Sequence, residues 1–306
     1  MTVAVEENVR LILARDSLTG LSVGDALGAR CVRPEQLDDG ELPDPVWEWT
    51  DDSEMACSIV AMLAARGAID RDELATAFAE RCTPQRGYGA GALRVLSMIR
   101  AGTPWATAAS TAFHGQGSCG NGAAMRIAPL GAYFADSARR AAAEAVAASE
   151  ITHAHPEGIA GGVAVAVAAS FAARARLGGR RPTPRELLTA VVDTLDAELG
   201  AAGAVRHGLR RAYTLVGQPA DAVARELGNG SAVTAQDTVP FTIWVAATFL
   251  DDYPQAIRTC VAAGGDTDTT AAITGGIVAA YTGVATPGGV PATWVEAREP
   301  LPEWVS

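Results

Sequence analysis

The chain has 306 residues, of which 49% are hydrophobic and 19% are charged, and this balance excludes a disordered or collagen-like protein. Its formal net charge of −11 argues against a general binder of nucleic acid or of a membrane surface, because a polyanion would be repelled. All 24 basic residues are arginine, so a lysine Schiff base and a lysine-type P-loop are both excluded. The five scattered cysteines form no CxxC pair and the N-terminus lacks a signal-peptide pattern, so we expect a cytoplasmic protein.

Alanine-rich segments of helical length follow one another along the chain, separated by Gly, Pro, Asp and Asn. They cover residues 54–66, 72–81, 90–101, 138–150, 157–176, 184–199, 204–214, 239–250 and 269–283. Sustained alternation of β-branched residues is absent, and VAVAV (163–167) is the only good candidate for a strand of an alternative α/β fold. The pattern predicts one all-α domain over residues 1–306. The apolar run 158–173 is shorter than the ~20 residues that span a bilayer, which favours a buried helix.

Acidic residues collect just before the first of these segments, in WEWTDDSE (47–54), after a stretch that is predicted to be loop (32–47). Asp51 and Glu54 have the spacing of a capping box, so a helix N-cap is the ordinary interpretation. A cation site is the other interpretation, because carboxylate and hydroxyl oxygens are the ligands that Mg²⁺ and Mn²⁺ prefer.

Two glycine-rich segments follow. RGYGAG (86–91) predicts a turn that opens a helix. FHGQGSCGNG (113–122) contains the spacing GxGxxG, with Asp136 roughly 20 residues later as in a dinucleotide-binding fingerprint. That fingerprint must follow a strand, whereas residues 105–112 look helical, so a Rossmann fold is not predicted. The loop amides could still form a cradle for an anion such as pyrophosphate, and a plain flexible loop is the alternative.

Two further polar segments precede long apolar runs. THAHP (152–156) holds two histidines, too few for a zinc site, and a lone histidine is more often a hydrogen-bonded core residue. GGDTDTT (264–270) places Asp266 and Asp268 two residues apart, with glycines that permit a tight turn, and a helix cap is again the alternative. Together with Asp51 and Asp52 they supply four carboxylates beside threonine hydroxyls, which is enough for two divalent metal ions.

Five motifs, in this order and spacing, resemble the ADP-ribosylglycohydrolase family, which includes dinitrogenase reductase-activating glycohydrolases and ADP-ribosylhydrolases. The motifs are WTDDSEMA (49–56), RGYGAGALRVL (86–96), FHGQGSCGNGAAMR (113–126), THAHPEG (152–158) and GGDTDTTAAITGGIVAAYTG (264–283). With LTGLSVGDALGA (18–29) at its start, the resemblance covers nearly the whole chain.

The resemblance implies a compact, orthogonal all-α domain whose cleft holds two Mg²⁺ or Mn²⁺ ions, and hydrolysis of the glycosidic bond at the distal ribose of ADP-ribose. The metal ligands that it implies are Thr50, Asp51, Asp52, Asp266, Asp268 and Thr269. The substrate-binding residues that it implies are Phe113 on adenine, Gly117, Ser118, Gly120, Asn121 and Gly122 on the pyrophosphate, His153 near the phosphate and ribose, and Tyr88. Asp51, Asp52, Asp268 and Glu35 are the expected catalytic residues, and Asp25 is expected to support the fold.

RGYGAG and FHGQGS look closest to the branch that removes serine-linked ADP-ribose and degrades poly(ADP-ribose). That branch carries Tyr where this chain has Cys119, and its acid after GD-x-x-G is replaced by Val32, so Glu35 is the nearest substitute. A hydrolase of arginine-linked ADP-ribose, a catalytically silent ADP-ribose binder and an all-α prenyl-diphosphate enzyme are the alternatives. ADP-ribosylated proteins are the expected partners, and a monomer is favoured.

Overall fold

The computed structural model describes residues 5–30 and 42–305. Within them, regular structure is helical and the only β-type pairings are three isolated bridges, so the prediction of an all-α fold is confirmed. The helices are α1 (Glu7–Ala29), α3 (Asp51–Arg66), α4 (Arg71–Arg81), α5 (Ala90–Arg100), α6 (Trp105–Ser110), α7 (Ala112–Gly115), α8 (Gly122–Met125), α9 (Ala128–Tyr133), α10 (Ala138–Glu150), α11 (Pro156–Leu177), α12 (Pro184–Leu199), α13 (Ala204–Thr214), α14 (Ala220–Leu227), α15 (Ala235–Thr248), α16 (Tyr253–Ala263), α17 (Thr267–Thr282) and α18 (Ala292–Ala297), with 3₁₀ turns at Pro84–Arg86 and Glu303–Val305.

Local sequence signals explain where several helices begin and end. At α12 the Thr183 hydroxyl accepts from the Glu186 amide while the Glu186 carboxylate accepts from the Thr183 amide, and Gly200 follows the last turn. The predicted bounds 138–150, 184–199 and 204–214 are confirmed by α10, α12 and α13. The predicted start of 239–250 is wrong by four residues, because α15 continues through Pro240, which lacks the N–H for one helical hydrogen bond.

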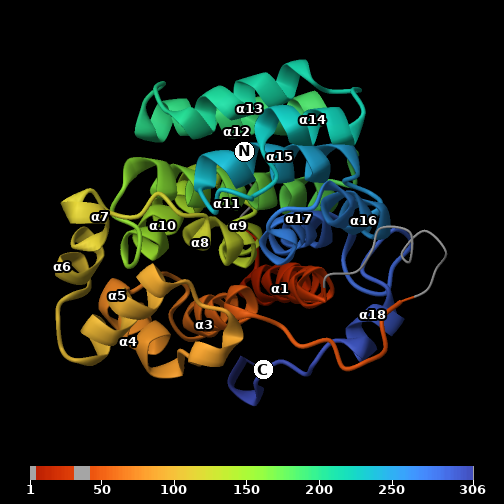
Figure 1. Cartoon of the computed structure of the whole chain (residues 1–306). Coiled ribbons are helices and arrows are strands. Elements are labelled where there is room, and N and C mark those ends of the chain that lie inside the picture. The colour runs from red at the N-terminus through yellow and green to blue at the C-terminus, as the bar shows by residue number, and fades with distance from the viewer. Residues whose placement is uncertain (1–4, 31–41, 306) are drawn as a thin grey trace.

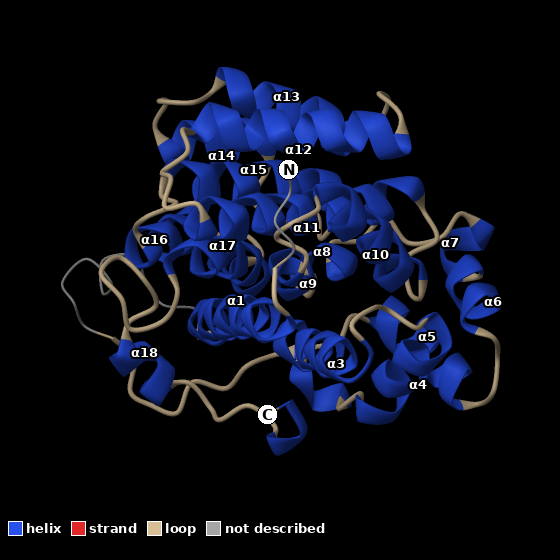
Figure 2. Ribbon diagram, turned by 180° about the vertical axis from the view of Figure 1, so that it is seen from behind, coloured by secondary structure: helices blue, strands red, loops and turns tan. Residues whose placement is uncertain are grey.

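Helix α11 is the central core helix and contacts α9, α10, α12, α15 and α17 (Figures 1 and 2). The predicted apolar run 158–173 lies inside this helix of 22 residues, which by length and composition alone is long and apolar enough to cross a membrane. However, 83% of its most apolar window is buried inside the protein. That degree of burial is typical of a core helix, which agrees with the predicted buried position.

Helices α1 and α17 lie against each other at unusually short range and occupy the middle of the molecule (Figure 1). Gly20, Gly24 and Gly28 form a stripe on α1, and a Cβ atom built on each would lie 2.5, 2.3 and 2.4 Å from a carbonyl oxygen of α17. Only glycine permits this approach. The Thr267 hydroxyl also donates to the Gly28 carbonyl (2.9 Å), so the N-terminus of α17 is fixed to the end of α1.

Asp25 of α1 fixes a second helix N-terminus at the same place. Its fully buried carboxylate accepts from the Thr50 amide (3.0 Å), the Thr50 hydroxyl (2.7 Å) and the Ser53 amide (3.2 Å). The expectation that Asp25 supports the fold agrees with these bonds. As a result α1 holds the starts of α3 and α17, and both acidic segments, side by side.

Candidate active site

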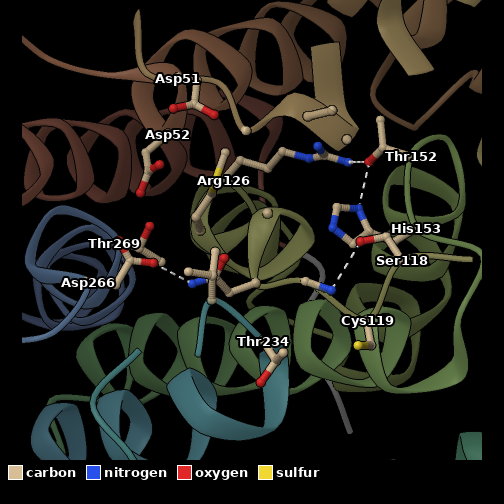
Figure 3. Close-up of a pocket in the computed structure, with 18 of the residues that line it drawn as sticks. Asp51, Asp52, Ser118, Cys119, Arg126, Thr152, His153, Thr234, Asp266 and Thr269 are labelled. Atoms are coloured by element: carbon tan, nitrogen blue, oxygen red, sulfur yellow. Dashed lines mark hydrogen bonds between the residues drawn. The ribbon is translucent and has the colours of Figure 1, made fainter. Parts of the chain in front are cut away.

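A cleft of about 420 Å³ lies where α3 and α17 begin. Figure 3 shows Asp51 and Asp52 above Asp266 and Thr269 at one side, and His153, Ser118 and Thr152 at the other. The predicted site residues that line the cleft are Asp51, Asp52, Phe113, Ser118, Gly120, Asn121, Gly122, His153, Asp266, Asp268 and Thr269. Thr50, Tyr88 and Gly117 are not in its wall, and Glu35 lies outside the described residues.

The acids at the start of α3 are not engaged in capping that helix. The cap is Thr50, whose hydroxyl accepts from the Asp52 amide (3.4 Å), so the predicted capping box of Asp51 and Glu54 is wrong. Glu54 instead accepts from the Tyr88 hydroxyl (2.7 Å) and the Thr83 amide (2.9 Å). The carboxylates of Asp51 and Asp52 therefore remain available to the cleft.

The acids at the start of α17 are likewise directed to the cleft. Asp266 stands at the N-cap position but makes no side-chain cap, and its Oδ2 accepts from the Asn121 side-chain amide (2.7 Å). Asp268 lies within the first turn of α17 rather than before the helix as predicted, and its Oδ1 accepts from the Thr269 amide (2.8 Å). The alternative that Asp266 is simply a cap is therefore wrong.

Burial and mutual repulsion favour the protonated form of Asp51, Asp52 and Asp266. Burial, followed by the charge of Asp25, raises the pKa of Asp51 to about 7 and that of Asp52 well above its usual range. Burial, followed by a hydrogen bond with Asp268, raises the pKa of Asp266 to about 7. Asp52 Oδ2 is buried without a hydrogen-bond partner. In the described part of the chain, no three His, Cys, Asp or Glu side chains already converge as a metal site.

The glycine loop is more occupied with its own contacts than the sequence predicts. The Gly120 amide donates to the Ser118 hydroxyl (3.1 Å), and the Asn121 amide donates to the Val233 carbonyl (3.3 Å). A Cβ on Gly117 would lie 2.5 Å from the His155 amide nitrogen, so this glycine serves close packing. A cradle for pyrophosphate thus has fewer free amides than the glycine pattern suggests.

The other predicted substrate-binding side chains differ in position. Phe113 is 62% exposed at the mouth of the cleft, with a left-handed backbone (φ 50°). His153 is buried in the cleft wall, where burial and the charge of Arg126 lower its pKa to about 3. Tyr88 is buried behind the acidic segment, with its hydroxyl on Glu54.

Sequence reasoning gave no role to several residues of the cleft. Arg126 and Thr152 line it and are buried, and the segment Ala232–Thr234 forms part of the wall. The signal for Arg126 was its position as the one charged residue in the apolar run AAMRIAPL (123–130). Segment 232–234 carries no comparable signal.

Comparison with known proteins identifies the family. The family model described as ADP-ribosylglycohydrolase matches residues 8–305. The human protein named ADP-ribosylhydrolase ARH3 is 30% identical over 82% of this chain and 74% of its own length. The mouse protein of that name is 28% identical over 94% of this chain and 88% of its own length.

A solved structure titled "ADP-ribosylglycohydrolase-related protein complex" has the same fold, with a TM-score of 0.65 and 23% identity over 95% of this chain and 94% of that one. The family assignment excludes the prenyl-diphosphate alternative and the α/β alternative. The chain belongs to the ADP-ribosylglycohydrolase family, as a hydrolase of its ARH3 branch.

Proposed function

We propose that the chain hydrolyses the glycosidic bond at the distal ribose of ADP-ribosylated substrates and releases ADP-ribose, with two Mg²⁺ or Mn²⁺ ions. The main support is the meeting of two acidic segments, far apart in sequence, on one side of a cleft whose other side is a glycine loop. A cleft of about 420 Å³ lies within the range of roughly 300–1,000 Å³ that is usual for ligand sites. The names of the relatives supply the ADP-ribosyl group as the substrate class.

The residues present fit divalent metal ions. Asp52 Oδ2 is a buried oxygen without a partner, and burial and the charge of neighbouring carboxylates raise the pKa of Asp51 and of Asp52, so a bound cation would relieve this repulsion. Thr50 donates its proton to Asp25 and accepts one long bond from the Asp52 amide (3.4 Å), which leaves one lone pair of its oxygen available. An all-oxygen set suits Mg²⁺ and Mn²⁺. The residues that would hold the ions are Thr50, Asp51, Asp52, Asp266, Asp268 and Thr269.

When bound, the ions would supply Lewis-acid contacts to ribose hydroxyls and lower the pKa of a water molecule. The bond between ribose C1 and the leaving oxygen breaks while a bond forms between C1 and the water oxygen. A carboxylate of Asp51, Asp52 or Asp268 takes the proton of the water, and the remaining carboxylates stabilise the positive charge that develops on the ribose. The leaving oxygen takes a proton from an acid. Contacts to adenine and pyrophosphate, at Phe113 and the glycine loop, position the ribose.

An O-linked substrate, serine-linked ADP-ribose or poly(ADP-ribose), is our first choice for the linkage, and arginine-linked ADP-ribose is the second. A serine alkoxide is a poor leaving group and needs a general acid. Glu35 is the proposed acid, so Glu35→Gln should slow serine-linked hydrolysis strongly and leave ADP-ribose affinity unchanged. Equal loss on arginine-linked substrate, or no loss on any linkage, would remove Glu35 from this role.

The experiment that tests the function is release of free ADP-ribose from serine-linked, arginine-linked and polymeric substrates, each with Mg²⁺, Mn²⁺ or EDTA. We expect release from the serine-linked and polymeric substrates with metal and none with EDTA. Asp51→Asn should lose this release, and Asp193→Asn, at an exposed position on α12, is its matched control for loss of a carboxylate. Full release in EDTA would refute the metal requirement, and no release from any substrate would refute the proposed reaction.

A further inference from the structure

Arg126 is a buried cation that forms no ion pair with the residues the structure describes. It follows α8, is 1% exposed, and no carboxylate of the described residues lies within ion-pair distance of its guanidinium. Burial lowers its pKa only to about 10, so it stays charged at neutral pH. Its Nη2 donates to the Ala148 carbonyl (3.0 Å) and to the Thr152 hydroxyl (2.9 Å), and its guanidinium lies 4.6 Å from the centre of the Phe78 ring. It therefore joins α8 to the segment that carries His153.

The bond to Thr152 determines the direction of the next bond. A guanidinium can only donate, so Thr152 Oγ1 accepts from Arg126 and must place its own single proton elsewhere. The other polar contact of this hydroxyl is His153 Nδ1, at 2.8 Å. Because Thr152 is buried, a hydroxyl without an acceptor would be costly, so Thr152 donates to Nδ1. Nδ1 is then unprotonated, and the proton of the neutral ring is on Nε2.

The Nε2 end of the ring is directed at the glycine loop. A Cβ built on Gly120 or Gly122 would lie 3.5 or 3.4 Å from Nε2. Within the described residues Nε2 has no hydrogen-bond partner. The atom is not completely buried either, so it is accessible from the cleft that His153 lines. Figure 3 shows the chain of contacts from Arg126 through Thr152 to the His153 ring, with Ser118 beyond it.

We propose that Arg126 and Thr152 are positioning residues that hold His153 as the neutral Nε2–H tautomer, so that the ring donates a hydrogen bond to a phosphate oxygen of the ligand at the glycine loop. The identity of this ligand, an ADP-ribosyl group, rests on the proposed function. The positive charge of the buried Arg126 guanidinium disfavours a second proton on the His153 ring. The ring therefore supplies a donor that does not change with pH in the neutral range.

The first measurement is the tautomer itself, from nitrogen NMR of the histidine rings in the ¹⁵N-labelled protein without ligand. The chain has four histidines, and the His153→Asn variant assigns the signals. We expect Nδ1 of His153 in the unprotonated region and Nε2 in the protonated region. A proton on Nδ1, or a doubly protonated ring near neutral pH, would overturn the proposal.

The second measurement compares variants by the same spectra and by calorimetric titration with ADP-ribose. Thr152→Val removes the hydroxyl at constant shape, and we expect a mixture of tautomers and a Kd about 10-fold higher. Thr152→Ser keeps the hydroxyl and should restore both. Thr242→Val is the matched control, because that buried hydroxyl donates only to the Val239 carbonyl of its own helix (3.0 Å).

The outcomes separate this inference from the function on which it rests. An unchanged tautomer and Kd in Thr152→Val would overturn the positioning role. If the ring carries Nε2–H but the wild-type protein binds no ADP-ribose, the tautomer stands, and both the choice of ligand and the proposed function are wrong.

Discussion

Gly28 is the position where the fold and the proposed chemistry are most directly connected. A Cβ there would lie 2.4 Å from the Thr267 carbonyl oxygen and 2.8 Å from the Asp268 Cα, both on the backbone of α17. Neither atom can rotate away as the end of a flexible side chain could. Gly28→Ala therefore requires the start of α17 to move by roughly 1 Å to reach an ordinary contact distance.

The two consequences of this shift differ in size. Overpacking costs about 1–3 kcal/mol, and the better helix propensity of Ala offsets about 1 kcal/mol, so the melting temperature should fall by only a few °C. The shift also moves Asp266 and Asp268 relative to Asp51 and Asp52. A displacement of about 1 Å between reacting groups can cost about 100-fold in rate. We expect Gly28→Ala to be folded, slightly less stable and about 100-fold slower.

Gly20→Ala is the control for this prediction. Its Cβ would meet the Ala279 Cβ at 2.2 Å and the Gly275 carbonyl oxygen at 2.5 Å, so the overpacking is at least as severe, but it lies farther along the same pair of helices. Thermal melts and kcat/KM for ADP-ribose release should show at least as large a stability loss for Gly20→Ala but a much larger rate loss for Gly28→Ala. Equal rate losses, or full activity of Gly28→Ala, would refute the reasoning.

Three further predictions follow from the cleft. Asp51→Asn or Asp268→Asn should abolish ADP-ribose release while circular dichroism shows an intact fold, and full activity in either would remove the two-metal site. The metal-free protein should lose stability as the pH rises from about 4 to about 7, because folded Asp51 and Asp266 titrate at about 7 instead of 3.8, so that in this range the folded protein binds more protons than the unfolded chain. Mg²⁺ at about 100 times its Kd should restore about 2.7 kcal/mol at pH 8, seen as a melting temperature several °C higher. Phe113→Ala should weaken ADP-ribose binding by about 1–3 kcal/mol in calorimetry if the ring stacks on adenine, and an unchanged Kd would contradict the stacking.

Helix type and many helix ends could be predicted from the sequence because their causes are local. The capping box at Thr183 and Glu186 lies at the start of α12 and Gly200 at its end, and these local signals predict both ends of the helix to within one residue. The two acidic segments and the glycine loop were also visible, since each is a short run of unusual composition. The structure brings all three to one cleft.

The remaining features depend on contacts between residues far apart in the sequence. Nothing near Tyr88 indicates that its hydroxyl is bound to Glu54, and nothing near Asn121 indicates that its side chain holds Asp266. The glycine stripe of α1 could be read as helix-breaking until α17 is seen against it. Local patterns therefore identify the chemistry, while tertiary packing decides which of these side chains face the cleft.

The central claim is that the two acidic segments hold divalent ions in one cleft. Crystals grown with Mn²⁺ and measured for anomalous scattering test it most directly. We predict two manganese peaks in the cleft, at Asp51 and Asp52 on one side and Asp266 and Asp268 on the other, and the loss of peaks in Asp268→Asn. Well-ordered carboxylates without a manganese peak between them, in a protein that still releases ADP-ribose, would contradict the claim.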